Sequence, residues 1–229
     1  TYILKIGEPI GSFFGLTRLG TYGTEEASLA ARYGMLPGDL KFLDRNNDGK
    51  IDLISDGGII GRSFPKVLAG FNNYFKYKKF DASINIQIVT GVNKAFIHES
   101  AEDRQLVSGG LNSTLTAWRP TAQNSMIAQV RPGNGGAYYQ SYADTHMISD
   151  ASFIRGGSAT IGYTFPVQAW KLQKIRAYIS AANFFLITNV EGYDPEGGSL
   201  DKQISLAPNS DKYQYPNPSI YSFGVNVSF

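Results

Sequence analysis

Hydrophobic and polar residues alternate over several stretches of this chain of 229 residues. The clearest stretch is the last, where Tyr221, Phe223, Val225, Val227 and Phe229 alternate with Ser222, Gly224, Asn226 and Ser228. The same alternation covers residues 67–77, 82–88, 158–165 and 175–182. Successive side chains of a β-strand point to opposite faces, so the pattern predicts strands with one apolar and one polar face. Helical spacing is convincing only over residues 25–33, which predicts one helix of about two turns.

Short and long connections alternate between these strands. The links at 78–80 and 166–174 are short, whereas the segments 7–65, 93–152 and 189–218 are long and polar. A soluble β-sandwich would instead place turns every 8–12 residues or so. Short periplasmic turns and long extracellular loops are typical of a transmembrane barrel. The alternation therefore predicts an all-β protein, a segment of about six strands of a transmembrane antiparallel β-barrel.

The predicted layout gives each range a place relative to the membrane. Hairpins cover 66–92 and 153–188, a terminal strand covers 219–229, and residues 1–6 form the top of a sixth strand. If the last strand ends in the periplasm, both short links fall on the periplasmic side, and the segments 7–65, 93–152 and 189–218 are extracellular. Gly156 and Gly157 adjoin in one strand, which is compatible with a kink or bulge.

Composition narrows the class of protein further. The chain is 42% hydrophobic and 17% charged, and a net charge of +2 gives no electrostatic reason to bind nucleic acid. There is no cysteine, which excludes disulfides and thiolate metal sites. The first residues lack an initiator methionine and signal-peptide features, which favours an interior start. The two histidines, His98 and His146, have no partner at a metal-ligand spacing, so no catalytic site is expected.

An ordered series of motifs extends over essentially the whole chain. It comprises Pro37-Gly38-Asp39, Asn46-Asn47-Asp48-Gly49, Gly70-Phe71-Asn72-Asn73, Trp118-Arg119-Pro120, Ser152-Phe153-Ile154-Arg155, Gly162-Tyr163-Thr164-Phe165-Pro166, Asn183-Phe184, Gly192-Tyr193-Asp194-Pro195-Glu196 and the stretch from Tyr215-Pro216 to Phe229. In this order and spacing the series resembles the C-terminal part of SusC/RagA-type TonB-dependent transporters from the outer membrane of Bacteroidetes. The specificity lies in the set, because no single motif is distinctive.

This resemblance implies an outer-membrane barrel of about 22 strands around a plug, of which this chain supplies one part. The plug and the segment that contacts the TonB complex would lie upstream, in the rest of the same polypeptide. It also implies active import of a large nutrient, an oligosaccharide or a peptide, with a SusD-like surface lipoprotein as a lid. Transport of this kind involves no covalent chemistry, so the chain is not expected to be an enzyme.

The last strand resembles the signal that the barrel-assembly machinery reads. Its apolar members, Tyr221, Phe223, Val225, Val227 and Phe229, end on an aromatic residue. Physically, such a strand could add to an open edge of that machinery. The strand would then face outer-membrane lipid once the barrel is closed.

The spacing of acidic residues after position 43 matches a calcium-binding loop. The predicted ligands are the side chains of Asp44, Asn46, Asp48 and Asp52, the carbonyl of Lys50 and, one place late, Asp56. Gly49 stands at the sixth position, where a sharp turn is needed. Ser55 stands at the twelfth, where calcium loops carry an acid. A structural Ca²⁺ is the predicted cofactor, and a metal-free turn held by Asx hydrogen bonds is the alternative.

Aromatic residues in the long segments are the candidates for substrate contact. They are Trp118, Tyr138, Tyr139, Tyr142 and Tyr193. Trp and Tyr offer rigid area and a hydrogen-bonding tip, which suits stacking on sugar rings or holding a peptide backbone.

Two other classes of protein remain open. One is a self-contained outer-membrane barrel of about eight strands with an adhesin or structural role, which would need further strands hidden in 93–152. The other is a soluble calcium-binding β-module, against which the uncharged last strand argues because it would be sticky in water.

Overall fold

The structure is a computed structural model that describes residues 2–96, 116–131, 143–166, 172–190, 194–196, 210–211 and 215–229. It divides into two compact units. The loop unit contains Thr1–Phe64, Asn93–Ser149 and Gly198–Gln214, and the sheet unit contains Pro65–Val92, Asp150–Gly197 and Tyr215–Phe229. Within the described ranges, no helix has the length and apolar character needed to cross a membrane.

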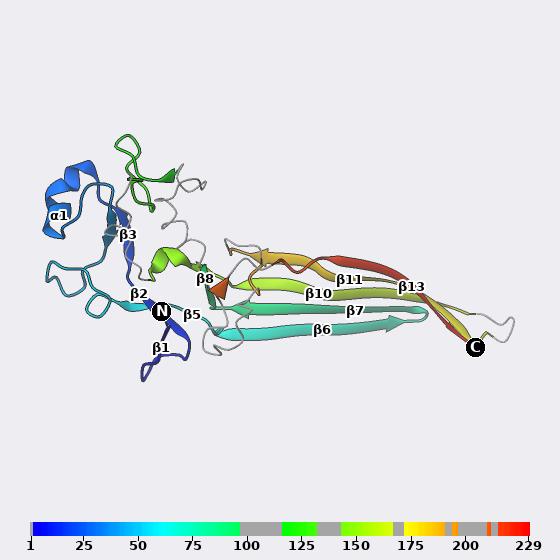
Figure 1. Cartoon of the computed structure of the whole chain (residues 1–229). Helices are drawn as coiled ribbons and strands as arrows, with labels where there is room; N and C mark the ends of the chain where they lie inside the picture. The colour runs from blue at the N-terminus through cyan, green and yellow to red at the C-terminus, as the bar shows by residue number, and fades with distance from the viewer. Residues whose placement is uncertain are drawn as a thin grey trace. The chain divides into compact units, whose positions relative to one another are not determined.

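The sheet unit is built on one antiparallel sheet of five strands (Figure 1). The strands are β6 (Val67–Tyr77), β7 (Phe80–Thr90), β10 (Phe153–Phe165), β11 (Lys174–Thr188) and β13 (Ile220–Ser228), in the spatial order β13-β11-β10-β7-β6. All five coincide with alternating stretches of the sequence. The strand prediction is therefore confirmed, with β7, β10 and β11 longer than the alternation alone indicated.

The strand registers bring the apolar positions of all five strands to the same face. Phe71 pairs with Ile86, Ile161 pairs with Ile179, and Ile179 pairs with Phe223 on the far side. These side chains are not covered, since Ile161 is 64% exposed and Phe223 is 73% exposed. A one-residue slip at any pairing would mix the two faces. The sheet thus has one continuous, exposed apolar face, which a sandwich would have buried.

A β-bulge interrupts β10 at its two adjacent glycines, as the sequence indicated. The register shifts between Gly156 and Ser158 against both β7 and β11. A Cβ at Gly156 would lie 2.6 Å from the Phe185 ring, and one at Gly157 would lie 2.3 Å from Asn85 Oδ1. Only glycine fits at Gly156 without displacing a neighbouring ring, so the bulge depends on this sequence.

Both short links lie at the same end of the sheet. Tyr77 pairs with Phe80 across the first link, and Phe165 pairs with Ile175 across the second. The C-terminus lies at this end too, as Figure 1 shows. The long connections, from β7 to β10 and from β11 to β13, leave from the other end.

The loop unit contains short strands and little helix. Its strands are β1 (Tyr2–Ile3), β2 (Ser12–Gly15), β3 (Arg18–Thr21), β4 (Leu40–Phe42), β5 (Gly58–Arg62), β8 (Asn93–Phe96) and β12 (Ser210–Asp211), with β9 (Ile148–Asp150) at its boundary. The 3₁₀-helix η1 (Thr24–Glu26) continues into α1 (Ala27–Arg32), which confirms the predicted helix, and a second 3₁₀-helix, η2, covers Thr145–Met147. Leu16, Leu40, Phe42 and Ala128 form a buried core in this unit.

The expectation that residues 1–6 form a sixth strand of the large sheet is wrong. Tyr2 pairs with Phe13 and Ile3 pairs with Ser12, so β1 belongs to the small sheet β1-β2-β5. Gly7 and Gly11 take positive φ angles, which lets the chain reverse direction within a few residues. Closing this local hairpin costs less chain entropy than pairing with β6, about sixty residues further on.

Candidate functional site

The polar face of the large sheet has small, mostly uncharged side chains. Among its members, Asn85 on β7 donates a side-chain hydrogen bond to Asn72 on β6. Charged residues of this face gather near the short-link end, where Arg176 Nε donates to Asp81 Oδ1 at 2.9 Å and where Lys76 and Lys174 also lie. The one acid of this group, Asp81, is therefore neutralised by a cation of a strand two places away. A face of this composition suits a water-filled interior.

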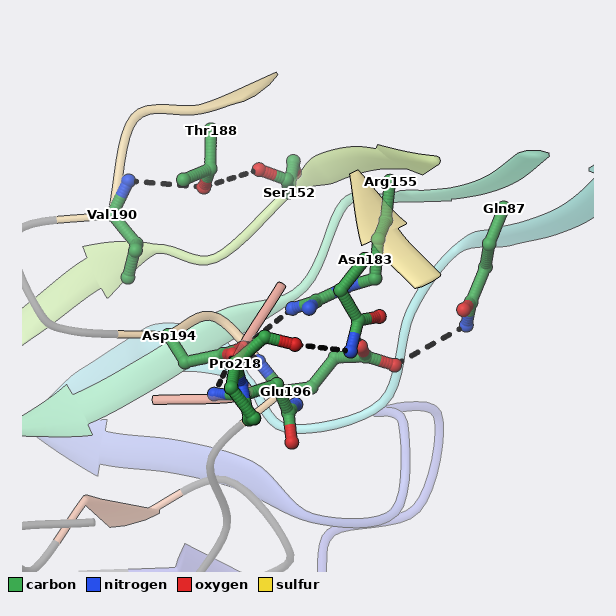
Figure 2. Close-up of polar contacts among 10 residues, drawn as sticks. Gln87, Ser152, Arg155, Asn183, Thr188, Val190, Asp194, Glu196 and Pro218 are labelled. Atoms are coloured by element: carbon green, nitrogen blue, oxygen red, sulfur yellow. Dashed lines mark hydrogen bonds and ion pairs between the residues drawn. The ribbon is translucent and has the colours of Figure 1, made fainter. Parts of the chain in front are cut away.

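A buried cation, Arg155, lies near the N-terminal end of β10, at the end of the sheet from which the long connections leave. Arg155 is 4% exposed, and its Nη2 donates to Asp194 Oδ1 at 2.6 Å (Figure 2). Its Nε lies 2.7 Å from Glu196 Oε2, an ionic contact without the alignment of a hydrogen bond. The guanidinium also lies 5.5 Å from the centre of the Phe153 ring. One arginine of a strand thus holds two acids of the connection between β11 and β13.

The two acids extend this attachment to other parts of the sheet unit. Asp194 Oδ1 accepts from Glu196 N at 2.9 Å, and Asp194 Oδ2 accepts from Asn217 N at 3.1 Å. Gln87 on β7 donates to Glu196 Oε1 at 3.3 Å, as Figure 2 shows. Burial opposes ionisation of Asp194, but these amides and Arg155 outweigh it and lower its pKa. The carboxylate is therefore held charged as the anchor of the connection.

Two ion pairs hold distant segments of the loop unit together. Arg18 Nε donates to Asp144 Oδ2 at 3.0 Å, and Arg18 Nη1 donates to the Met126 carbonyl at 2.9 Å. Arg131 Nη1 donates to Asp39 Oδ1 at 2.6 Å. Burial raises the pKa of Asp39, against the opposing effects of the Leu36 amide and Arg131. The described parts of the segments 7–65 and 93–152 are therefore cross-linked within the loop unit.

The predicted calcium loop has the turn geometry expected from its sequence. Asp44 Oδ1 accepts from Asn47 N at 2.7 Å and Asp44 Oδ2 accepts from Gly49 N at 3.0 Å. Asn47 and Gly49 both adopt positive φ, which curls the loop. Tyr33 also donates to Asp44 at 3.1 Å, joining the loop to the residue that follows α1. Burial opposes ionisation of Asp44, yet these hydrogen bonds lower its pKa.

The carboxylates of this loop accept from backbone amides rather than converge on one centre. Asp48 Oδ1 accepts from Lys50 N at 2.8 Å, and Asp52 Oδ1 accepts from Ser55 N at 2.8 Å. Asp56, fully buried, accepts from the amides of Arg45 and Asp52. Asn46 donates to Asp48 at 2.9 Å. No group of three or more His, Cys, Asp or Glu side chains suited to a metal occurs in the part of the chain that the structure describes.

The predicted substrate contacts are mostly not placed by the structure. Tyr138, Tyr139, Tyr142 and Tyr193 lie outside the described residues. Trp118 is 3% exposed, and its Nε1 has no hydrogen-bond partner. Its ring edge lies 2.8 Å from where a Cβ of Gly38 would be, so it packs inside the loop unit. In this conformation Trp118 does not present its ring face to a ligand.

The residues of the predicted assembly signal lie on or directly after β13. Tyr221, Phe223, Val225, Val227 and Phe229 are all exposed. In the described part of the chain, β13 pairs only with β11. Its free edge and its apolar face are therefore both open.

Sequence reasoning did not find the ion pairs. Arg155 and Asp194 belong to two of the motifs, but their pairing joins positions 39 apart. Arg18 and Asp144 are 126 apart. The available signal was a charged residue inside an otherwise uncharged strand, Arg155, which requires a partner when it is buried.

Comparison with known proteins gives one consistent result. No protein-family model matches the chain. The TonB-dependent receptor P3 of Formosa agariphila is 30% identical over the whole chain, and the TonB-dependent receptor SusC of Bacteroides thetaiotaomicron is 29% identical over 82% of it. These matches cover 23% and 17% of the two relatives, so the chain spans about a quarter of their length or less.

Solved structures agree on the fold. The RagAB peptide importer in its open-open state superposes on the whole chain with a TM-score of 0.70 at 21% identity, covering 24% of the matched chain. The closed-closed state of the same importer gives 0.68 over 95% of the chain at 19% identity, covering 23% of the matched chain.

Proposed function

Because this chain belongs to the SusC/RagA-type TonB-dependent receptors of the bacterial outer membrane, we propose that it forms part of the wall and outer loops of a barrel that imports a large nutrient. The observation that carries this proposal is the five-stranded sheet with its apolar positions in phase on one exposed face. Such a face is unfavourable in water and suited to lipid. Its other face is polar, as an aqueous passage requires.

The proposal includes an orientation. The short links and the C-terminus face the periplasm, and the segments 7–65, 93–152 and 189–218 lie outside the cell. The registers support this, because both short links lie at one end of the sheet and the long connections leave from the other. Long loops on the outer side are typical of outer-membrane barrels.

The transport cycle would depend on partners and on residues beyond this chain. Energy would come through the TonB complex, contacted by the plug region of the complete receptor, and a SusD-like surface lipoprotein would act as the lid. The nutrient would be an oligosaccharide or a peptide, and no covalent chemistry is involved. The name of the RagAB peptide importer supports the peptide class for that relative.

A structural Ca²⁺ in the loop around Asp44 is a second part of the proposal. The curled backbone at Asn47 and Gly49 supports it, although the carboxylates of the described loop accept from amides instead. Calorimetric titration of the full-length receptor with Ca²⁺ tests it. Binding heat that disappears in Asp48→Asn but persists in Asp150→Asn supports a bound ion. Absence of heat in the unaltered receptor identifies the loop as a metal-free Asx turn.

Import is tested by deleting the gene for the complete receptor and growing the cells on single nutrient sources. A panel of oligosaccharides and of peptide mixtures is the probe. Loss of growth on one class, restored by the receptor but not by a receptor lacking its TonB-contacting segment, is the expected result. Growth unchanged on every source would contradict the proposal.

Affinity purification of the tagged receptor from native membranes tests the lid. A surface lipoprotein in stoichiometric amount is expected. The rival small barrel is disfavoured by one pairing, because β7 contacts β10 directly and leaves no room between them for strands from 93–152.

A further inference from the structure

Four aromatic rings gather at the short-link end of the large sheet. Tyr77 and Phe80 face each other across the turn between β6 and β7, and they are 70% and 55% exposed. The Phe80 ring lies 4.7 Å from the Tyr163 ring, which lies 4.8 Å from the Phe165 ring. These four residues are called the ring row. All lie on the apolar face, so the row marks the level at which that face ends.

Two lysines form the turn itself. Lys78 has a φ of 53°, in the left-handed region that favours Gly and Asn in two-residue turns. Its Nζ lies 5.2 Å from the centre of the Tyr77 ring. The Lys79 carbonyl accepts from Thr164 N at 2.8 Å, which ties the turn to β10. A lysine therefore occupies a position where a smaller residue would be less strained, beside an exposed ring.

The charge at this end is positive. Lys174 begins β11 here, opposite Ser228. The acid at this end in the described residues is Asp81, and Arg176 pairs with it. Lysines directly beyond a belt of rings match a lipid surface, because rings prefer the headgroup level and ammonium groups attract anionic phosphates.

We propose that the Lys78-Lys79 turn and the ring row form a contact site for anionic phospholipid headgroups of the inner leaflet. The rings set the depth of the sheet, and the two ammonium groups reach the phosphates. This inference rests on the membrane placement in the proposed function and not on import. The ligand is a lipid, because the turn adjoins the lipid-facing side of the sheet.

The test uses the full-length receptor in nanodiscs of phosphatidylethanolamine containing a minor share of phosphatidylglycerol. Native mass spectrometry of the released complex measures the ratio of the two lipids that stay bound. Phosphatidylglycerol is expected to exceed its bulk share. The double variant Lys78→Gln/Lys79→Gln is expected to lower this enrichment by about fivefold per lysine. The control is Lys66→Gln. Lys66 is exposed and directly precedes the first residue of β6, at the opposite end of the strand from Lys78, so this change should leave the ratio unchanged.

The outcomes are separable. Equal enrichment in the double variant and the unaltered receptor overturns the inference while leaving the membrane placement intact. Loss of a co-purifying protein with no change in lipid ratio also overturns it, and indicates a protein contact. A receptor that stays monodisperse in buffer without detergent overturns the membrane placement itself. Heat-modifiable migration in gels confirms that the double variant has folded.

Discussion

At the residue scale, Arg155 is the group whose removal should matter most. Its side chain and that of Asp194 are 5% and 4% exposed, so Arg155→Gln leaves a buried carboxylate without its cation. Removing one partner of such a pair costs about 3–5 kcal/mol. We expect the connection between β11 and β13 to detach from β10. Limited proteolysis of the full-length receptor within residues 190–217 should then become much faster.

The matched control is Arg32→Gln in α1, an exposed arginine whose loss should leave the cleavage rate unchanged. The double variant Arg155→Gln/Asp194→Asn should recover most of the protection, because no charge is then buried alone. Equal cleavage rates for Arg155→Gln and the unaltered receptor would show that the ion pair does not hold the connection.

Acid should weaken the same attachment. The pKa of Asp194 is lowered in the folded state, where amide hydrogen bonds and Arg155 outweigh burial. The contribution of Asp194 to the stability of this attachment is therefore complete above the pKa of an unfolded Asp carboxyl group, about 3.9. It is lost as the pH falls through the lower pKa of the folded state. Cleavage within 190–217 by an acid-active protease should accelerate below about pH 4. The Asp194→Asn variant should be cleaved fast at every pH. A cleavage rate of the unaltered receptor that does not change with pH would refute this role of Asp194.

At the element scale, β13 offers a direct comparison of the two faces of the sheet. Val225 lies on the apolar face and Asn226 on the polar face, one residue further along. A lysine on a lipid-facing position costs about 2–4 kcal/mol near the midplane, while a lysine facing water costs little. Val225→Lys should therefore lower the amount of assembled receptor in the outer membrane, and Asn226→Lys should not. Equal levels of the two variants would contradict the assignment of faces.

The pairing of β11 with β13 requires a glycine opposite an aromatic ring. A Cβ at Gly224 would lie 2.4 Å from the Tyr178 ring. Overpacking of this kind costs about 1–3 kcal/mol, so Gly224→Val should lower the temperature at which the receptor loses its heat-modifiable form. Ser222→Val, on the same face opposite Ser180, is the control. Adding Tyr178→Ala to Gly224→Val should raise this temperature again, because the ring that the valine contacts is then gone. If the temperature stays low, the contact with Tyr178 is not the cause of the defect.

The elements that sequence predicted well are those whose pattern is local. A period of two is visible in the sequence of β13 itself, and the adjacent glycines of β10 mark their own bulge. The segment 1–6 shows the limit of this reasoning. The order of strands and connections predicts the top of a strand there but not its partner, and the nearby turn at Gly7 and Gly11 decides for β2.

At the scale of the whole molecule, the described parts of the long polar segments 7–65 and 93–152 are joined in a folded unit. The residues that join them are scattered, as Arg18 with Asp144 and Asp39 with Arg131 show. Such pairings follow from three-dimensional closure, which polarity and length along the sequence do not encode. Sequence reasoning therefore identified the wall of the barrel and described its loops only as long. Several of the paired residues belong to the family motifs: Asp39 in a loop, Arg155 on β10 and Asp194 in the connection between β11 and β13.

The large sheet also predicts how this chain behaves alone. In the described residues, β6 pairs only with β7 and β13 pairs only with β11, so both edges are open. Open edges and an uncovered apolar face favour association. The 229-residue chain refolded into detergent should therefore aggregate and run in gels without a heat-modifiable form, whereas the full-length receptor should show one. A monomeric, heat-modifiable chain would mean that β6 and β13 close on each other, and would make the small barrel the better account.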